Sequence, residues 1–250
     1  MITDYHAKLF AHEITKKYSS DSLEKFAGIL SEAQVDLNPH QVDAALFAFK
    51  SPFSNGAILA DEVGLGKTIE AGILLSQQWA ERKRKILIIV PSSLRKQWQL
   101  ELIEKFFLPS IIMENNEFNR INENKKKNPF EQDKIVICSY NFASNKDEYI
   151  MLINWDLVII DEAHRLRNVW KPENKTANKI KIALKNRKKV LLTATPLQNS
   201  LMELYGLISF VDEFTFGDKK SFKEQFIRLS DTEDEFDDLK ERLKLICNRT

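Results

Sequence analysis

Short apolar runs alternate with segments of helical spacing between residues 56 and 211. This alternation is typical of βαβ units that join into a mostly parallel sheet. The expected strands cover residues 56–60, 86–90, 134–138, 157–160 and 189–193. The expected helices cover residues 39–49, 67–82, 93–106, 174–185 and 200–210. The pattern predicts an α/β fold in which helices cover a mostly parallel sheet.

Amphipathic segments flank this region on both sides. Residues 3–17 and 21–34 have the spacing of two helices, which we interpret as packing elements. After Asp212 the chain becomes more charged, and its pattern predicts helices over residues 219–229 and 232–247. We therefore expect extra helices before and after the sheet.

One interior stretch interrupts the alternation. Residues 114–133 are polar and rich in asparagine, which is typical of a surface loop or insertion. The resulting organisation has three parts: a helical extension over residues 1–36, a sheet-containing lobe over 37–212 and a helical segment over 213–250.

The composition and charge of the chain indicate which kind of protein it is. With 43% hydrophobic and 29% charged residues, the chain reads as an ordinary globular protein, and its net charge of +1 argues against a global basic surface. Cys138 and Cys247 show no metal-binding spacing. The longest apolar run, Ile86–Val90, is too short to cross a membrane, and the N-terminus lacks the layout of a secretion signal. We expect a cytoplasmic protein without a membrane partner.

A phosphate-binding loop is predicted where the first strand leads into a helix. Backbone N–H groups and a helix N-terminus at such a turn suit a polyphosphate. Lys67 adds a charge for the β- and γ-phosphates, and the Thr68 hydroxyl can ligate Mg²⁺. The alternative is a glycine turn followed by a chance Lys-Thr pair. The residues expected to bind ATP here are Asp61, Glu62, Val63, Gly64, Leu65, Gly66, Lys67 and Thr68.

A second motif follows the strand predicted over residues 157–160. Asp161 is expected to hold Mg²⁺, and Glu162 to orient and polarise the attacking water. The alternative is that both carboxylates only cap the next turn. His164 is expected either to couple the nucleotide to neighbouring elements or to form a hydrogen bond within the turn.

Together with a third motif, these segments resemble superfamily-two helicase-like ATPases, and within them the Swi/Snf-type DNA translocases of the bacterial RapA-like branch. The matching motifs are residues 61–68, 161–168 and 192–199. In this family an acidic pair replaces the leading glycine of the phosphate loop, as Asp61 and Glu62 do here. The resemblance covers about residues 37–212 and implies the first RecA-like lobe, a P-loop three-layer sandwich that uses ATP and Mg²⁺.

The resemblance also implies roles for residues outside the main motifs. Gln41 corresponds to a glutamine that reads adenine, although the residue could instead face solvent on its helix. Ser92 and Ser93 correspond to residues that contact nucleic acid, or they cap the helix while Trp98 packs in the core.

Two further pairs are implied by the resemblance. Ser139 and Tyr140 correspond to residues that contact the same DNA strand. Thr193 and Thr195 correspond to residues that couple the nucleotide to the tracking surface, although a Thr-Pro turn would explain them as well.

Members of this family need a second RecA-like lobe, which supplies arginines to the transition state. No second phosphate loop follows Phe210, so we expect the chain to bind ATP–Mg²⁺ but to hydrolyse ATP poorly alone. The expected partners are double-stranded DNA and a second lobe of the full-length chain, with RNA or RNA polymerase also possible. The alternatives are the motor of a strand-separating helicase or of a restriction or phage-defence system and, in another class, an ATP-dependent switch or scaffold.

Overall fold

The computed structural model describes residues 38–50, 56–61, 66–123, 127–196, 200–228 and 233–248. The helices predicted over residues 3–17 and 21–34 lie outside the described residues. So do four residues of the predicted phosphate loop, namely Glu62, Val63, Gly64 and Leu65.

A seven-stranded sheet forms the centre of the molecule, with the strand order β3-β4-β2-β5-β6-β1-β7. The strands are β1 (Gly56–Leu59), β2 (Ile86–Val90), β3 (Ser110–Ile112), β4 (Ile135–Ser139), β5 (Leu157–Asp161), β6 (Lys189–Leu192) and β7 (Cys247–Asn248). All of their pairings are parallel. The predicted α/β class is confirmed, and the five predicted strands correspond to β1, β2, β4, β5 and β6.

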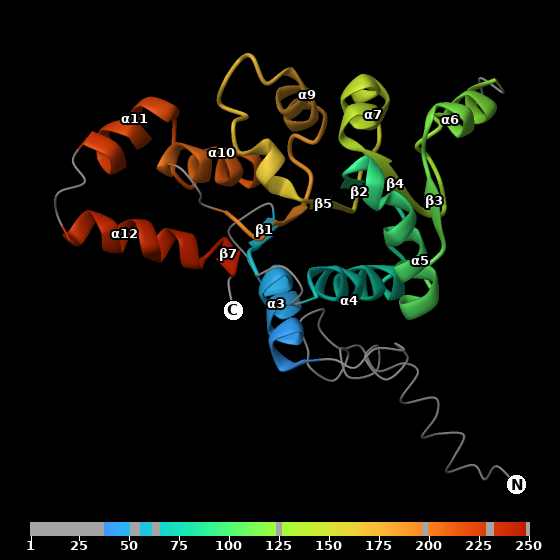
Figure 1. Cartoon of the computed structure of the whole chain (residues 1–250), viewed down its shortest axis with the longest axis horizontal. Coiled ribbons are helices and arrows are strands. Elements are labelled where there is room, and N and C mark those ends of the chain that lie inside the picture. Colours follow the sequence, from blue (N-terminus) through green and yellow to red (C-terminus); the bar gives the residue numbers. More distant parts are fainter. Residues whose placement is uncertain are drawn as a thin grey trace, which may run out of the picture.

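Helices cover both faces of the sheet (Figure 1). On one face lie α3 (Pro39–Lys50), α4 (Lys67–Ala80) and α5 (Arg95–Phe106). On the other face lie α7 (Tyr140–Asn145), α9 (Lys175–Ala183) and α10 (Leu201–Val211). The remaining helical elements are η1 (Ser92–Leu94), α6 (Asn115–Asn122), α8 (Asp147–Met151), η2 (Ala163–Leu166), α11 (Lys219–Lys223), a π-helical turn (Glu224–Arg228) and α12 (Glu233–Lys244).

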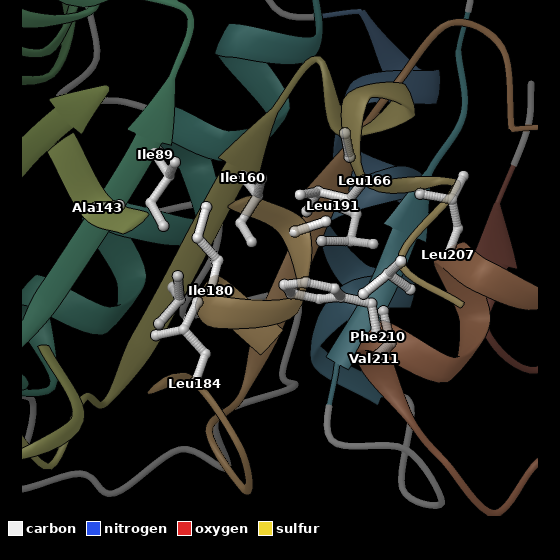
Figure 2. Packing of buried hydrophobic residues seen from close by; sticks show 14 of the residues in the cluster. Ile89, Ala143, Ile160, Leu166, Ile180, Leu184, Leu191, Leu207, Phe210 and Val211 are labelled. Atoms are coloured by element: carbon white, nitrogen blue, oxygen red, sulfur yellow. The ribbon is translucent and has the colours of Figure 1, made fainter. Parts of the chain in front are cut away.

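The core is divided by the sheet into two apolar clusters. Along β2, Leu87 and Ile89 point into one cluster, whereas Ile86, Ile88 and Val90 point into the other. Successive side chains of a strand face opposite sides, so a sheet buried on both faces requires continuous apolar runs. Figure 2 shows Ile89 within the cluster that the second group of helices covers.

The polar stretch at residues 114–133 contains more structure than predicted. Helix α6 occupies Asn115–Asn122, and its Phe118 is buried. The Phe118 ring meets Phe130 and Tyr149 edge to face, with centroids 6.1 and 5.0 Å apart. The prediction of a loop throughout was wrong, because Phe118, together with the partly buried Ile121, is enough to anchor an otherwise polar helix.

The last predicted helix also ends earlier than expected. Helix α12 ends at Lys244, and Cys247–Asn248 forms β7 instead of a final helical turn. The N–H of Ile58 donates to the carbonyl of Ile246 (2.7 Å), so the chain pairs with the open edge of β1. Satisfying the backbone groups of that edge strand outweighs continuing the helix.

Among the helices that the structure describes, none combines the length and the apolar character needed to cross a membrane.

Candidate active site

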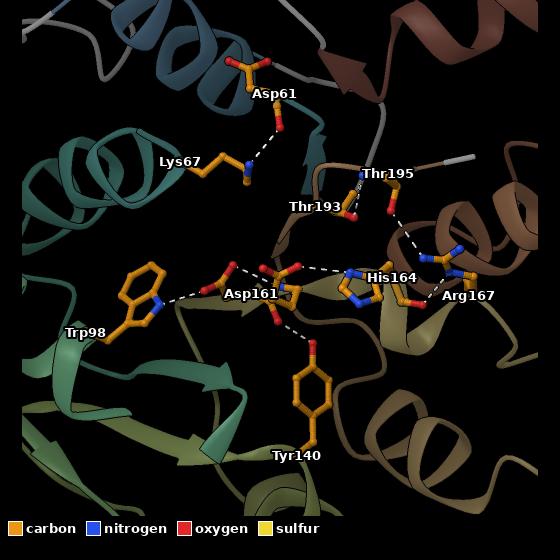
Figure 3. Close-up of polar contacts among 10 residues, drawn as sticks. Asp61, Lys67, Trp98, Tyr140, Asp161, His164, Arg167, Thr193 and Thr195 are labelled. Atoms are coloured by element: carbon orange, nitrogen blue, oxygen red, sulfur yellow. Dashed lines mark hydrogen bonds and ion pairs between the residues drawn. The ribbon is translucent and has the colours of Figure 1, made fainter. Parts of the chain in front are cut away.

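The carboxyl ends of β1, β6 and β5 lie at one level of the sheet. Leu59 pairs with Leu192, and Leu192 pairs with Asp161. Because neighbouring strands are about 4.8 Å apart, two steps across the sheet separate Leu59 from Asp161 by about 10 Å. The predicted phosphate loop and the predicted acidic pair therefore begin at the same edge (Figure 3).

The start of α4 has the features that a phosphate needs. Gly66 has φ 92°, and a Cβ on it would lie 2.3 Å from Nε2 of Gln41. Glycine at this position tolerates the positive φ and leaves room for the Gln41 side chain. Within the described residues no side chain caps this helix, although the N–H of Ile69 donates to the carbonyl of Gly66 (2.7 Å). The positive end of the helix dipole at this turn suits an anion. The Lys67 amine meanwhile donates to the Asp61 carbonyl (2.8 Å), as Figure 3 shows.

Gln41 lies beside this turn and is not the solvent-facing residue of the alternative interpretation. Its side chain is 5% exposed, and its Oε1 accepts from the N–H of Asn38 (3.2 Å). This contact fixes the side chain at the start of α3, with its amide nitrogen next to Gly66.

Asp161 is buried at the end of β5, and both of its oxygens accept hydrogen bonds. Oδ2 accepts from the indole N–H of Trp98 (2.8 Å), and Oδ1 accepts from the N–H of Glu162 (2.8 Å). Burial raises the pKa of Asp161, while these two hydrogen bonds and, more weakly, the Lys67 charge oppose that rise. Trp98 was expected to serve only as a core residue. It packs in the core and also orients Asp161.

These groups fit the Mg²⁺ that the resemblance implies. A carboxylate oxygen that accepts one hydrogen bond keeps a second lone pair, so Asp161 can still act as a ligand. In the described part of the chain, no three His, Cys, Asp or Glu side chains gather as a metal cluster. This is compatible with Mg²⁺, which is commonly held by one or two carboxylates together with phosphates and water.

Glu162 has an unusual backbone conformation for a residue with a side chain. Its φ is 52° and its ψ is 45°, in the left-handed region, where strain is often found at functional sites. Its Oε2 lies 3.1 Å from Nδ1 of His164. Burial lowers the pKa of His164, and the Glu162 charge partly offsets that effect. The hydrogen bond of His164 to the turn is thus present, in line with one of its two interpretations.

The threonines of the third motif lie between the two motifs. Thr193 is buried, and its N–H donates to the carbonyl of Leu59 (3.0 Å). The Thr193 hydroxyl accepts from the N–H of Thr195 (3.3 Å), and the Thr195 hydroxyl accepts from Nη2 of Arg167 (3.4 Å). This segment therefore connects the end of β1 to the residues that follow η2.

The serines predicted to contact nucleic acid lie at the ends of β2 and β4. Ser92 and Ser93 are exposed, and no side chain caps η1 or α5 in the structure as described, so the capping alternative is not supported. Ser139 does cap a helix, because its hydroxyl accepts from the N–H of Phe142 (3.2 Å). An open cavity of about 420 Å³ lies next to Ser139 and Arg95.

The prediction that Tyr140 contacts DNA is wrong for this structure. The ring is buried, and its hydroxyl donates to the backbone carbonyl of Asp161 (2.6 Å). A buried phenol needs such a partner, and Tyr140 finds one below the active-site edge. This hydrogen bond holds the backbone of Asp161 at the end of β5.

Glu70 is a polar residue that the sequence analysis passed over. It lies on α4 with its side chain fully buried, and neither of its oxygens accepts an N–H among the described residues. Burial and the neighbouring Asp61 charge raise its pKa to about 8. A hydrogen bond between these two carboxyl groups requires a proton on one of them.

The sequence is similar to those of known proteins. The chain is 37% identical over 215 residues to the "Uncharacterized ATP-dependent helicase YqhH" of Bacillus subtilis (strain 168), covering 84% of this chain and 36% of that protein. It is 35% identical over 214 residues to the "RNA polymerase-associated protein RapA" of Pectobacterium carotovorum subsp. carotovorum (strain PC1), covering 83% of this chain and 22% of that protein. The chain thus spans about a third or less of these relatives.

The fold has a solved counterpart. The structure described as "Sulfolobus solfataricus SWI2/SNF2 ATPase core in complex with dsDNA" aligns with a TM-score of 0.71 and 25% identity, covering 87% of this chain and 45% of that one. The seven-stranded sheet is accordingly of the RecA-like type. Because residues 14–250 match the family described as the SNF2-related domain, the chain belongs to that family.

Proposed function

We propose that this chain is the ATP-binding lobe of an SNF2-type helicase-like ATPase that moves along nucleic acid and remodels protein–nucleic-acid complexes. The observation that carries this proposal is the shared edge of β1 and β5. Lys67 and the pair Asp161–Glu162 come from separate motifs, yet the Lys67 charge is close enough to affect the pKa of Asp161.

The phosphates of ATP would lie over the first turn of α4. Lys67 now donates to a backbone carbonyl, and the β- and γ-phosphates are stronger partners for its amine. Thr68 and Asp161 would hold Mg²⁺, which when bound neutralises charge on the phosphates. Glu162 would orient the attacking water, with His164 fixing its carboxylate. Gln41, next to Gly66, is suited to the adenine edge.

The surface at the ends of β2 and β4 would contact the nucleic acid. The solved counterpart is described in complex with double-stranded DNA, and the RapA relatives are named for association with RNA polymerase. We propose double-stranded DNA as the track, with RNA or RNA polymerase as alternatives. The exposed Ser92 and Ser93, together with Ser139 and the adjoining cavity, offer polar groups to backbone phosphates.

Full activity would require a second lobe in the full-length protein. The chain spans only part of its relatives, and the family uses arginines from that lobe to stabilise the transition state. Such an arginine raises the rate by about a thousandfold or more. We therefore expect the 250-residue chain to bind ATP–Mg²⁺ and to hydrolyse it slowly, with little stimulation by DNA.

Binding of fluorescent ATP–Mg²⁺ to the 250-residue chain tests the proposal. Lys67→Ala removes the only mobile cation predicted for the phosphates, and we expect the affinity to fall by about 10- to 100-fold. Lys105→Ala is the matched control, because Lys105 pairs with Glu101 on the surface of α5 and should leave binding unchanged. Equal binding by the wild type and Lys67→Ala would refute the proposed site.

In the full-length protein, triplex displacement would report translocation, and strand displacement would report a strand-separating helicase. We expect triplex displacement without strand separation. The opposite pattern would favour the helicase alternative.

A further inference from the structure

Arg167, just after η2, joins three separate elements through one buried guanidinium. Its Nη1 lies 3.2 Å from Oε2 of Glu203 on α10, and both side chains are only 10% exposed. Arginine presents donors in a planar fork, so it can hold several acceptors at fixed angles. A buried pair of this kind is specific in geometry even where it adds little stability.

The same guanidinium reaches both motifs that border the nucleotide. Its Nε donates to the carbonyl of His164 (2.8 Å), and the imidazole of His164 contacts Glu162. Its Nη2 donates to the hydroxyl of Thr195 (3.4 Å). Figure 3 shows Arg167 between His164 and Thr195.

Helix α10 meets Arg167 a second time, one turn after Glu203. A Cβ on Gly206 would lie 2.0 Å from the Arg167 carbonyl, so the helix approaches the backbone there as closely as glycine allows. Glu203 therefore fixes the side chain of Arg167, and the close approach of Gly206 fixes its backbone. A shift of η2 must be followed either by α10 or by loss of these contacts.

We propose that Arg167 and Glu203 are positioning residues that couple the state of Glu162 to the Thr193–Thr195 segment and to α10. The inference rests on the proposed function, because it concerns how ATP turnover is linked to nucleic acid. When the turn at Glu162 moves, the His164 carbonyl moves with it, and the guanidinium transmits this to Thr195.

Steady-state ATPase assays of the full-length protein test this inference. In Glu203→Gln, we expect nucleic-acid-stimulated kcat to fall by about 2- to 30-fold, equivalent to about 0.5–2 kcal/mol, while KM for ATP stays within about twofold. Arg167→Lys keeps the charge beside Glu203 but loses the fork. It should retain the wild-type melting temperature and ATP binding and still lose stimulation, which a merely structural pair would not predict.

Glu213→Gln provides the matched control. Glu213 pairs with Lys181 at 3.2 Å just beyond the end of α10, but its side chain is half exposed, so stimulation should not change. Wild-type stimulation in both Glu203→Gln and Arg167→Lys would overturn the inference alone. The inference would also be overturned if Glu203→Gln and Arg167→Lys both weakened ATP binding and lowered the melting temperature to the same extent. A wild-type protein that does not hydrolyse ATP would overturn the proposed function and the inference together.

Discussion

The edge of the sheet at which the strands have their carboxyl ends consists of two halves that are built differently. At the ends of β1, β6 and β5, Asp61, Asp161 and Thr193 are buried and form hydrogen bonds with other elements. At the ends of β2 and β4, Ser92 and Ser93 are exposed, and an open cavity lies nearby. The first half suits chemistry, which needs fixed groups in a low dielectric. The second half suits a nucleic acid that is bound through its backbone phosphates, independently of its base sequence.

The largest effect on activity is expected from a substitution in the half that contains Asp161 and Glu162. Glu162→Gln in the full-length protein removes the carboxylate that we propose polarises the attacking water, so we expect kcat to fall by about 100-fold or more. ATP binding should be retained, because we propose that Lys67 and the start of α4 hold the phosphates. Radiolabelled phosphate release and equilibrium binding measure the two properties. Turnover within about threefold of the wild type would assign the base to another group.

A smaller effect is expected from Glu70, the buried carboxyl group on α4. Glu70 keeps its proton to about pH 8 in the folded chain, against 4.5 when unperturbed. The unfolded chain therefore binds fewer protons in this window, so the contribution of Glu70 lowers stability as pH rises from 4.5 to about 8. Glu70→Gln stays neutral, and its amide can donate to Asp61. We expect the variant to be about 1–3 kcal/mol more stable than the wild type above pH 8.

Chemical denaturation of the nucleotide-free chain at several pH values measures this difference. Near pH 4.5 the two proteins should be almost equally stable. If the difference in unfolding free energy between the two proteins stayed constant across this pH range, the pKa of Glu70 would not be raised. Glu104→Gln, which changes an exposed carboxylate on α5, provides a control for loss of a carboxylate.

The smallest effect is expected in the open half. Arg95 lines the cavity and pairs with the exposed Glu114 at 3.0 Å. Arg95→Ala should weaken binding of DNA by the full-length protein a few-fold, equally for all sequences, and reduce the salt slope by about 1. Arg120→Ala, which removes an exposed arginine from neighbouring α6, is the control. An unchanged slope in Arg95→Ala would exclude Arg95 as a phosphate contact.

The fold was largely predictable from the sequence because buried parallel strands require continuous apolar runs. The two edge strands were missed, since β3 has three residues and β7 has two, too few for any periodicity. The helix at Asn115–Asn122 was missed because only Phe118 and Ile121 mark its packed side.

The site was predictable only where its residues are adjacent in the chain. The motifs at Lys67 and Asp161 could be read directly, whereas Trp98 lies 63 positions before Asp161, and Glu203 lies 36 after Arg167. Such pairings arise from strand order, which a single sequence does not encode locally. Glu70 did leave a signal, as a carboxylate within the apolar run that follows Thr68.

The central claim is that Thr68 and Asp161 would hold the Mg²⁺ that accompanies bound phosphates. ATP binding to the wild type and to Asp161→Asn, each with and without Mg²⁺, tests it most directly. We predict that Mg²⁺ strengthens binding to the wild type and that Asp161→Asn loses this enhancement while keeping its metal-free affinity. An equal Mg²⁺ enhancement in both proteins would contradict the account.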